Sequence, residues 1–150
     1  IKVPAADREK TYRLFIQQAP PRGDAAQQGA QVAIRVRFGV PIFVKPLKEE
    51  LRAEFAEVAV RGGKLQLRIR NNGNAHVYFE SIAAAGAEGR SAEARGWYVL
   101  AGRTRAFEVP LTGELCRDAR SLHVSAHYEA QGKKLKLETD VPVNAGGCAP

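Results

Sequence analysis

Two histidines, His123 and His127, have a spacing that could support metal chemistry. On a helix, imidazoles four residues apart share a face and could hold one zinc ion. The neighbouring Leu122, Val124 and Ala126 alternate with polar residues, however, and this pattern predicts a strand. Along a strand that rises about 3.3 Å per residue, the two rings would lie roughly 13 Å apart. We therefore expect two histidines on the solvent face of a strand and no shared metal.

The chain lacks the motifs of the common enzyme classes. It contains none of the GxSxG, HExxH, phosphate-loop or GxGxxG patterns of hydrolases, metalloproteases and nucleotide-binding enzymes. Three acidic residues, Glu80, Glu108 and Asp140, are scattered without a recognisable partner, and surface solubility explains them. We therefore expect a protein that is not an enzyme and that uses neither a cofactor nor a metal.

The two cysteines, Cys116 and Cys148, form no CxxC pair and no Cys/His cluster with the spacing of a zinc site. They are either two separate buried thiols or the halves of a disulfide. The even count and the glycine-rich tail before Cys148 favour the disulfide. It would close a loop of about 32 residues and stabilise the fold by roughly 3 to 4 kcal/mol. A disulfide also predicts an oxidising compartment.

Charge and composition bear on two classes of partner. The 23 Lys and Arg against 16 Asp and Glu give a formal net charge of +7, which favours anionic partners. A nucleic-acid surface would need clustered cations and stacking aromatics, yet aromatics make up 7% of the chain and the cations are spread along strand faces. These spread cations are Arg35, Arg37, Arg68, Arg70, Lys134 and Lys136. We expect no nucleic-acid partner and no membrane insertion, since no apolar run approaches the ~18 to 20 residues of a membrane span.

Alternation of apolar and polar residues recurs from end to end, which predicts an all-β protein. With 150 residues and 45% hydrophobic content, the chain can bury a sizeable core. It contains no Met and begins at Ile1, so we expect a processed or incomplete chain whose signal peptide, if any, has been removed.

Two strands are expected in the N-terminal part. Residues 12–16 form a short apolar run, and a turn-rich loop of about fourteen residues follows. The second strand starts near residue 32 and continues to residue 44. Its first half places four apolar side chains on one face, namely Val32, Ile34, Val36 and Phe38. Pro41 has no N–H and cannot occupy a fully paired central position, so this is predicted to be an edge strand.

A polar, proline-marked stretch at residues 45–50 predicts a boundary between two domains, residues 1–45 and residues 46–150. About six or seven short strands follow it in roughly 100 residues, which is typical of a β-sandwich. The strand at residues 65–69 ends at the turn sequence NNGN, and a return strand begins at Val77.

The rest of this region is expected to contain one loop and two hairpins. Residues 83–95 are small and charged, which predicts the loop. The first hairpin turns at Ala101-Gly102 and continues to residue 111. The second joins residues 122–126 to a partner strand that runs from Leu135 to Val143.

Four segments in conserved order resemble one family. Residues 8–16, the segment RFGVPIFVKP at 37–46, the segment KLQLRIRNNGNAHV at 64–77 and WYVLAG at 97–102 are similar to periplasmic pilus-assembly chaperones. The resemblance spans nearly the whole chain. It implies two immunoglobulin-like sandwiches. The N-terminal one lacks its early strands in this chain, and the C-terminal one is complete.

The resemblance also implies a mechanism. Such chaperones lend the last strand of the N-terminal domain to a pilus subunit whose own fold lacks a strand, until an outer-membrane usher exchanges it. Val32, Ile34, Val36 and Phe38 would then be the subunit-binding residues of the donor strand. The expected partners are pilus or fimbrial subunits and the usher, and the expected compartment is the periplasm.

One position departs from the family pattern. The better-known members hold the subunit's terminal carboxylate with an Arg on the first strand and a Lys on the donor strand, through charge-assisted contacts. The donor-strand Lys aligns with Pro41 here, so Arg37 and Lys45 are the nearest candidates for an anionic anchor.

Other interpretations stay open beside this one. The apolar stripe formed by Val32, Ile34, Val36 and Phe38 could face the core of its own domain and bind nothing. The chain could be a secreted or surface immunoglobulin-like adhesion module that binds through loops such as residues 86–96, or a basic nucleic-acid-binding β domain. An incomplete N-terminal sandwich would collapse on the C-terminal domain, self-associate or stay disordered.

Overall fold

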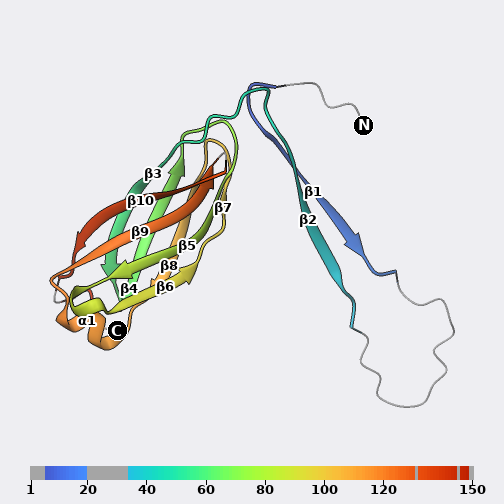
Figure 1. Cartoon of the computed structure of the whole chain (residues 1–150). Coiled ribbons are helices and arrows are strands. Elements are labelled where there is room, and N and C mark those ends of the chain that lie inside the picture. The colour runs from blue at the N-terminus through green and yellow to red at the C-terminus, as the bar shows by residue number, and fades with distance from the viewer. Residues whose placement is uncertain (1–5, 20–33, 131, 145, 149–150) are drawn as a thin grey trace, which may run out of the picture.

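The chain forms a β-sandwich and a separate two-stranded hairpin that projects from one end of it (Figure 1). The computed structural model describes residues 6–19, 34–130, 132–144 and 146–148. The hairpin consists of β1 (Lys10–Gln17) and β2 (Arg37–Val44). The predicted boundary at residues 45–50 falls between this hairpin and the first strand of the sandwich, and the all-β sandwich predicted from alternation is confirmed.

The sandwich consists of two antiparallel sheets. Three strands form the first, β3 (Ala53–Arg61), β4 (Lys64–Asn71) and β8 (Thr104–Pro110), in the order β3-β4-β8. The second sheet has the order β10-β9-β5-β6, with β7 paired to β5. Its strands are β5 (Val77–Ala85), β6 (Ser91–Arg95), β7 (Tyr98–Val99), β9 (Ser121–Ala130) and β10 (Lys133–Pro142).

Alternation along β4 shows how the sequence decides which face is buried. Leu65, Leu67 and Ile69 are at most 1% exposed, whereas Arg68 and Arg70, which alternate with them, face solvent. Successive side chains of a strand point to opposite faces, so these three aliphatic residues meet the second sheet. There the ring of Phe79 lies 6.4 Å from that of Phe107 on β8, which links the two sheets through aromatic packing.

The predicted turn at residues 71–74 is present, but it does not make a hairpin. β4 pairs with β3 and β8, whereas β5 pairs with strands of the second sheet, so the chain crosses between sheets here. Buried Asn71 explains the crossing. Its Nδ2 donates to the carbonyl oxygens of Ala75 (2.8 Å) and Val99 (2.9 Å), and its Oδ1 accepts from the amide of Gly73 (2.8 Å). The side chain thereby provides hydrogen-bond partners for three backbone groups at the crossing.

The predicted hairpin around Ala101-Gly102 is wrong for a similar reason. The turn exists, with Gly102 at a φ of 68° that favours glycine. The two strands that it joins belong to different sheets, because β7 pairs with β5 and β8 pairs with β4. Local turn chemistry shows where the chain reverses, but it does not choose the strand's partner.

The loop predicted at residues 83–95 is too long, because only residues 86–90 lie outside the strands. β5 continues to Ala85, the short 3-10 turn η1 (Ala87–Gly89) follows, and β6 begins at Ser91. Ala92 and Ala94 pack against the core, while Ser91, Glu93 and Arg95 face solvent. Alanine is uncommon in strands, and the segment resembled a loop because its buried positions are all small.

The final hairpin agrees with the sequence. β9 and β10 pair antiparallel, with Leu122 opposite Val141 and Ala126 opposite Leu137. Its turn contains Gly132 at a φ of 73°.

A short helix, α1 (Gly113–Asp118), was not predicted because six residues are too few to show helical periodicity. The side chain of Thr112 caps it by accepting from the amide of Leu115 at 3.2 Å. Cys116 in this helix is joined to Cys148 by a disulfide, so the C-terminal tail is tied to this end of the sandwich. Among the described residues, no helix has the length and apolar character needed to span a membrane.

Replacing Asn71 by alanine is expected to lower the free energy of unfolding by about 2 to 4 kcal/mol, because two carbonyl groups and one amide then lose their buried partner. Urea unfolding followed by circular dichroism measures this change. Asn72→Ala is the matched control, since Asn72 is the exposed neighbour. A loss below about 1 kcal/mol for Asn71→Ala would contradict this role.

Candidate functional site

The hairpin β1–β2 has two chemically different faces. The strands pair antiparallel from Lys10 opposite Val44 to Gln17 opposite Arg37. Directly opposite residues share a face, so the pairs alternate between the two sides of the ribbon. The side that we call the apolar face carries Tyr12, Leu14, Ile16, Phe38, Val40 and Ile42. The side that we call the inner face carries Arg13, Phe15, Gly39, Pro41 and Phe43.

The apolar face is open to solvent. Its six large side chains are between 43% and 60% exposed. In Figure 1 the hairpin extends away from the sandwich, and no described segment lies over it. A contiguous exposed apolar surface of this kind marks an interaction site, because burying such side chains against a partner is favourable.

The hairpin also presents free strand edges. β1 and β2 form a sheet of their own, so each has a single strand neighbour within the described residues. The outer backbone N–H and C=O groups of such strands can pair with another chain. This agrees with the edge position that Pro41 predicted for β2.

The inner face attaches the hairpin to the sandwich. The ring of Phe43 stacks on His76 with centroids 3.9 Å apart, and it meets Tyr98 edge-on at 5.5 Å. The guanidinium of Arg13 donates a hydrogen bond of 2.8 Å to the Tyr98 hydroxyl. These contacts direct the inner face toward the sandwich and leave the apolar face uncovered.

A buried carboxylate reinforces the attachment just before β1. The side chain of Glu9 is 1% exposed. Its Oε2 lies 2.7 Å from Nδ1 of His76, and its Oε1 accepts from the amide of His76 at 3.3 Å. Burying a carboxylate is costly unless it is paired and hydrogen-bonded, so this joint is sensitive to the loss of either partner.

Asn74 binds three segments together at the same joint. Its Nδ2 donates to the carbonyl oxygens of Asp7 and Lys48, each at 2.8 Å, and its Oδ1 accepts from the amide of Glu50 at 2.7 Å. Its own carbonyl accepts from the amide of Glu9 at 2.8 Å. The chain before β1 and the segment after β2 are therefore both fixed to one turn of the sandwich.

The predicted donor residues are largely solvent-exposed where they are described. Ile34 is 78%, Val36 40% and Phe38 60% exposed, while Val32 lies outside the described residues. The predicted strand from residue 32 is too long, because β2 begins at Arg37 and residues 34–36 belong to no strand. Much of the predicted loop of about fourteen residues also lies outside the described part. The collapse of the hairpin onto the sandwich, one of three expected fates, is not observed.

The two predicted anionic anchors both have partners within the chain. The guanidinium of Arg37 lies over the ring of Phe15, 4.1 Å from its centroid. Lys45 Nζ lies 2.9 Å from a carboxylate oxygen of Glu49, and this hydrogen bond raises the pKa of Lys45 above its ordinary value. The hairpin register instead places Arg13 directly opposite Pro41. Arg13 was missed because its position depends on pairing between strands 28 residues apart, and its contact with Tyr98 depends on the docking of the hairpin.

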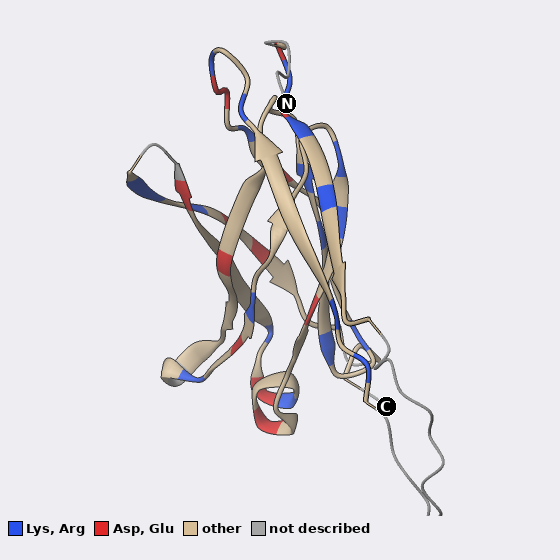
Figure 2. Ribbon diagram, turned by 90° about the vertical axis from the view of Figure 1, so that its right-hand side faces the viewer, with Lys and Arg blue, Asp and Glu red and all other residues tan. Residues whose placement is uncertain are grey.

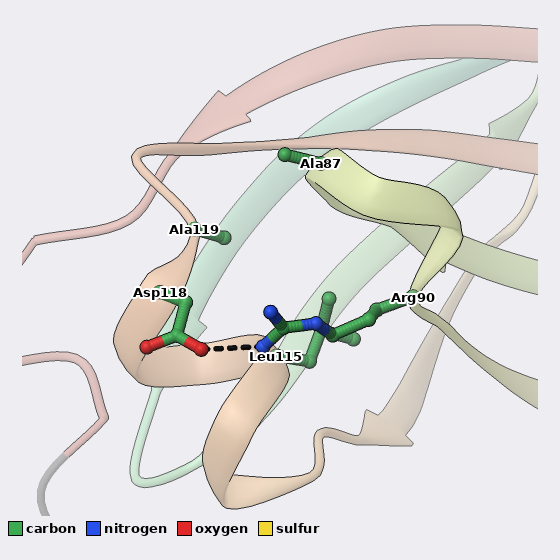
Figure 3. Close-up of a pocket in the computed structure, with 5 residues that line it drawn as sticks. All are labelled: Ala87, Arg90, Leu115, Asp118 and Ala119. Atoms are coloured by element: carbon green, nitrogen blue, oxygen red, sulfur yellow. Dashed lines mark hydrogen bonds and ion pairs between the residues drawn. The ribbon is translucent and has the colours of Figure 1, made fainter.

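The loop region of the alternative adhesion module borders a hollow of about 250 Å³ between η1 and α1 (Figure 3). Arg90 and Asp118 point toward each other across it and form an ion pair. Leu115 lines the same hollow. The two charges satisfy each other, so this hollow offers less to a charged ligand than the surfaces of the hairpin do.

The histidines of β9 lie on the solvent face, as predicted. The Nδ1 atom of His123 lies 2.9 Å from Asp140 and its Nε2 atom 3.1 Å from Glu138, whereas His127 contacts Ser125. The hydrogen bonds to Asp140 and then Glu138 raise the pKa of His123. Asp140 thus has a partner that the sequence did not reveal, and so does Glu108, which pairs with Lys64 at 2.9 Å.

Comparisons of the chain with protein-family models, with curated proteins and with solved structures found no match. The functional argument therefore depends on the geometry of the hairpin and its joint.

Glu9→Ala is expected to loosen the hairpin while the sandwich stays folded. Loss of a hydrogen bond to a charged group costs roughly 1.5 to 3 kcal/mol, so amide exchange in β1, β2 and His76 should accelerate about tenfold or more. Hydrogen–deuterium exchange resolved by NMR measures the rates. Glu54→Ala removes an exposed glutamate from β3 and should change nothing. Unchanged hairpin rates in Glu9→Ala would show that the carboxylate does not hold the joint.

The raised pKa of His123 has a defined pH signature. The folded chain holds the proton more tightly than the unfolded chain, so the small stabilisation is complete below the unfolded pKa and is lost as the pH rises through the folded one. Asp140→Asn should move the pKa of His123 back toward its ordinary value, measured by NMR titration of the imidazole. Glu108→Gln, which changes an exposed carboxylate on β8 of the other sheet, should not. An identical titration in the wild type and Asp140→Asn would refute the assignment.

Proposed function

We propose that this protein is a periplasmic chaperone for pilus or fimbrial subunits that acts by lending the edge of its hairpin to an incomplete partner. The observation that carries the proposal is the hairpin itself, whose apolar face and strand edges are uncovered within the described residues. The resemblance of residues 8–16, 37–46, 64–77 and 97–102 to pilus-assembly chaperones supports the same assignment.

The stripe of Val32, Ile34, Val36 and Phe38 provides the recognition chemistry. Backbone groups of the donated segment would pair with the subunit's strands, and alternate side chains would fill its groove. Burying four such side chains contributes a gross term of roughly 6 to 12 kcal/mol, and each added main-chain hydrogen bond about 0.5 to 1.5 kcal/mol. The cost of association reduces both.

The joint supports donation because it holds the hairpin in a defined orientation. Glu9, Phe43 and Arg13 attach it to the sandwich without using the apolar face. A pre-ordered strand loses less conformational entropy on binding than a loose one. The Cys116–Cys148 disulfide is compatible with an oxidising compartment such as the periplasm. Delivery to an outer-membrane usher completes the proposed cycle.

A second candidate is an adhesion module that binds through residues 86–96. The observation in favour of this candidate is the hollow between η1 and α1, which borders this loop. Self-association through the apolar face is a third outcome, and it would appear as a concentration-dependent dimer. The same set of variants separates all three.

The test is to express the tagged protein in the periplasm of its source organism and to identify co-purifying proteins by mass spectrometry. Ile34→Arg/Val36→Arg places two charges in the stripe and should abolish recovery of a pilin-sized partner. Leu47→Arg/Leu135→Arg is the matched control, because it changes two exposed apolar residues outside the stripe to arginine. It should leave recovery unchanged.

A photoreactive residue at position 34 identifies the surface that is used. Cross-links to a pilus subunit from position 34, and none from position 47, would support strand donation. A partner that survives the Ile34/Val36 double variant would favour the adhesion module and reject the proposal. Cross-links only to a second copy of the chain would favour self-association and equally reject it.

A further inference from the structure

A hollow of about 270 Å³ lies where β1 meets the sandwich, and three arginines line it. They are Arg13 of the hairpin, Arg103 in the turn before β8, and Arg105 on β8. Tyr98 and Thr104, whose side chains carry hydroxyl groups, line the same hollow. The remaining lining residues, Val99 and Leu100, are apolar.

Two of these guanidinium groups are held by aromatic side chains. Arg13 donates to the Tyr98 hydroxyl at 2.8 Å, so that hydroxyl still has its own proton to donate to a ligand. The guanidinium of Arg105 lies 5.9 Å from the ring centroids of both Trp97 and Tyr98. Contacts of this kind hold a cation in place while its N–H groups stay available.

The backbone around Arg103 is also fixed. Its amide donates to the carbonyl of Leu100 at 3.0 Å, and its carbonyl accepts from the amide of Asn71 at 2.9 Å. A fourth guanidinium, that of Arg8, lies close to this turn at Gly102. Its Nη2 atom would be 2.8 Å from a Cβ atom placed on that glycine. The turn that carries Arg103 is therefore held by backbone hydrogen bonds on both sides of this residue.

No carboxylate compensates these charges within the described residues. No Asp or Glu lines the hollow, and none of the ion pairs in the described part of the chain involves Arg13, Arg103 or Arg105. By contrast, Arg90 in the hollow beside α1 is paired with Asp118. In Figure 2, which is viewed from the hairpin side, Lys and Arg segments prevail over Asp and Glu on the right-hand ribbons.

We infer that this hollow is a binding site for an oxyanion, a carboxylate or a phosphate, held by Arg13, Arg103, Arg105 and the Tyr98 hydroxyl. Guanidinium groups match both kinds of oxyanion with paired, charge-assisted hydrogen bonds. Three cations gathered in one hollow repel each other, and an anion between them removes that repulsion. The inference goes beyond the proposed chaperone function and does not depend on it.

The position of the site gives binding a structural consequence. Arg13 belongs to the hairpin, whereas Arg103 and Arg105 belong to the sandwich. An oxyanion shared by them bridges the two parts and restrains the hairpin. Binding therefore slows amide exchange in β1, and this slowing requires Arg13.

The test titrates the protein with sodium phosphate and, separately, with sodium succinate, at constant ionic strength maintained with chloride. Trp97 is the single tryptophan of the chain and lies beside Arg105, so its fluorescence reports on the site. NMR shifts of the backbone amides at residues 97–105 locate the binding. A saturable response to either anion supports the site, and a response to one alone identifies the preferred oxyanion.

Arg103→Gln/Arg105→Gln is expected to weaken binding about tenfold or more, because hydrogen bonds to charged groups are lost. Arg13→Gln should weaken binding and also remove the ligand-dependent slowing of exchange in β1. Arg117→Gln on α1 is the matched control with the same change in charge, and it should bind as the wild type does. Circular dichroism spectra verify that each variant is folded.

Two results would overturn the inference. One is the absence of any saturable response to either anion up to tens of millimolar. The other is an equal response in the wild type and in Arg103→Gln/Arg105→Gln, which would show general screening of surface charge rather than a site.

Discussion

A pair of strands that stands apart from a larger sheet satisfies its backbone hydrogen bonds on one side only and leaves its faces to be covered by something else. The hairpin β1–β2 is in this position within the described chain. Its inner face provides the attachment, through Phe43 and Arg13, and the six large side chains of the apolar face are exposed. The direction in which the hairpin presents its side chains therefore follows from the way it is attached.

The joint between hairpin and sandwich combines two electrostatic environments. On one side the buried carboxylate of Glu9 is matched by the imidazole and amide of His76. On the other side, the guanidinium groups of Arg13, Arg103 and Arg105 share a hollow without a carboxylate. The carboxylate of Glu9 already has hydrogen-bond partners within the chain, whereas the three guanidinium groups have no carboxylate beside them in the hollow. This difference is why the arginine hollow, and not the Glu9 pair, points to a ligand.

The surface suggested by the sequence and the surface found in the structure overlap but are not identical. Ile34, Val36 and Phe38 are exposed where described, and Val40 and Ile42 extend the apolar surface along β2 beyond the predicted stripe. The two residues predicted as anionic anchors already have partners, since Arg37 lies over the ring of Phe15 and Lys45 pairs with Glu49. The cation opposite Pro41 is Arg13, which no local pattern in the sequence distinguishes from other strand arginines.

Alternation along the chain determines most of the strands and the face that each one buries, because the period of two is a property of adjacent residues. Leu65, Leu67 and Ile69 required no more than this to be assigned to the core. The same is true of the β9–β10 hairpin, whose strands are close in sequence.

Only the tertiary structure decided which strands pair and which charges meet. The turns at residues 71–74 and 101–102 were recognisable, yet both lead to the other sheet, since Asn71 satisfies the backbone at the crossing. The Glu9–His76 and Arg13–Tyr98 contacts join residues 67 and 85 positions apart. Contacts between residues far apart in the sequence depend on how whole elements pack, and no local sequence pattern determines this packing.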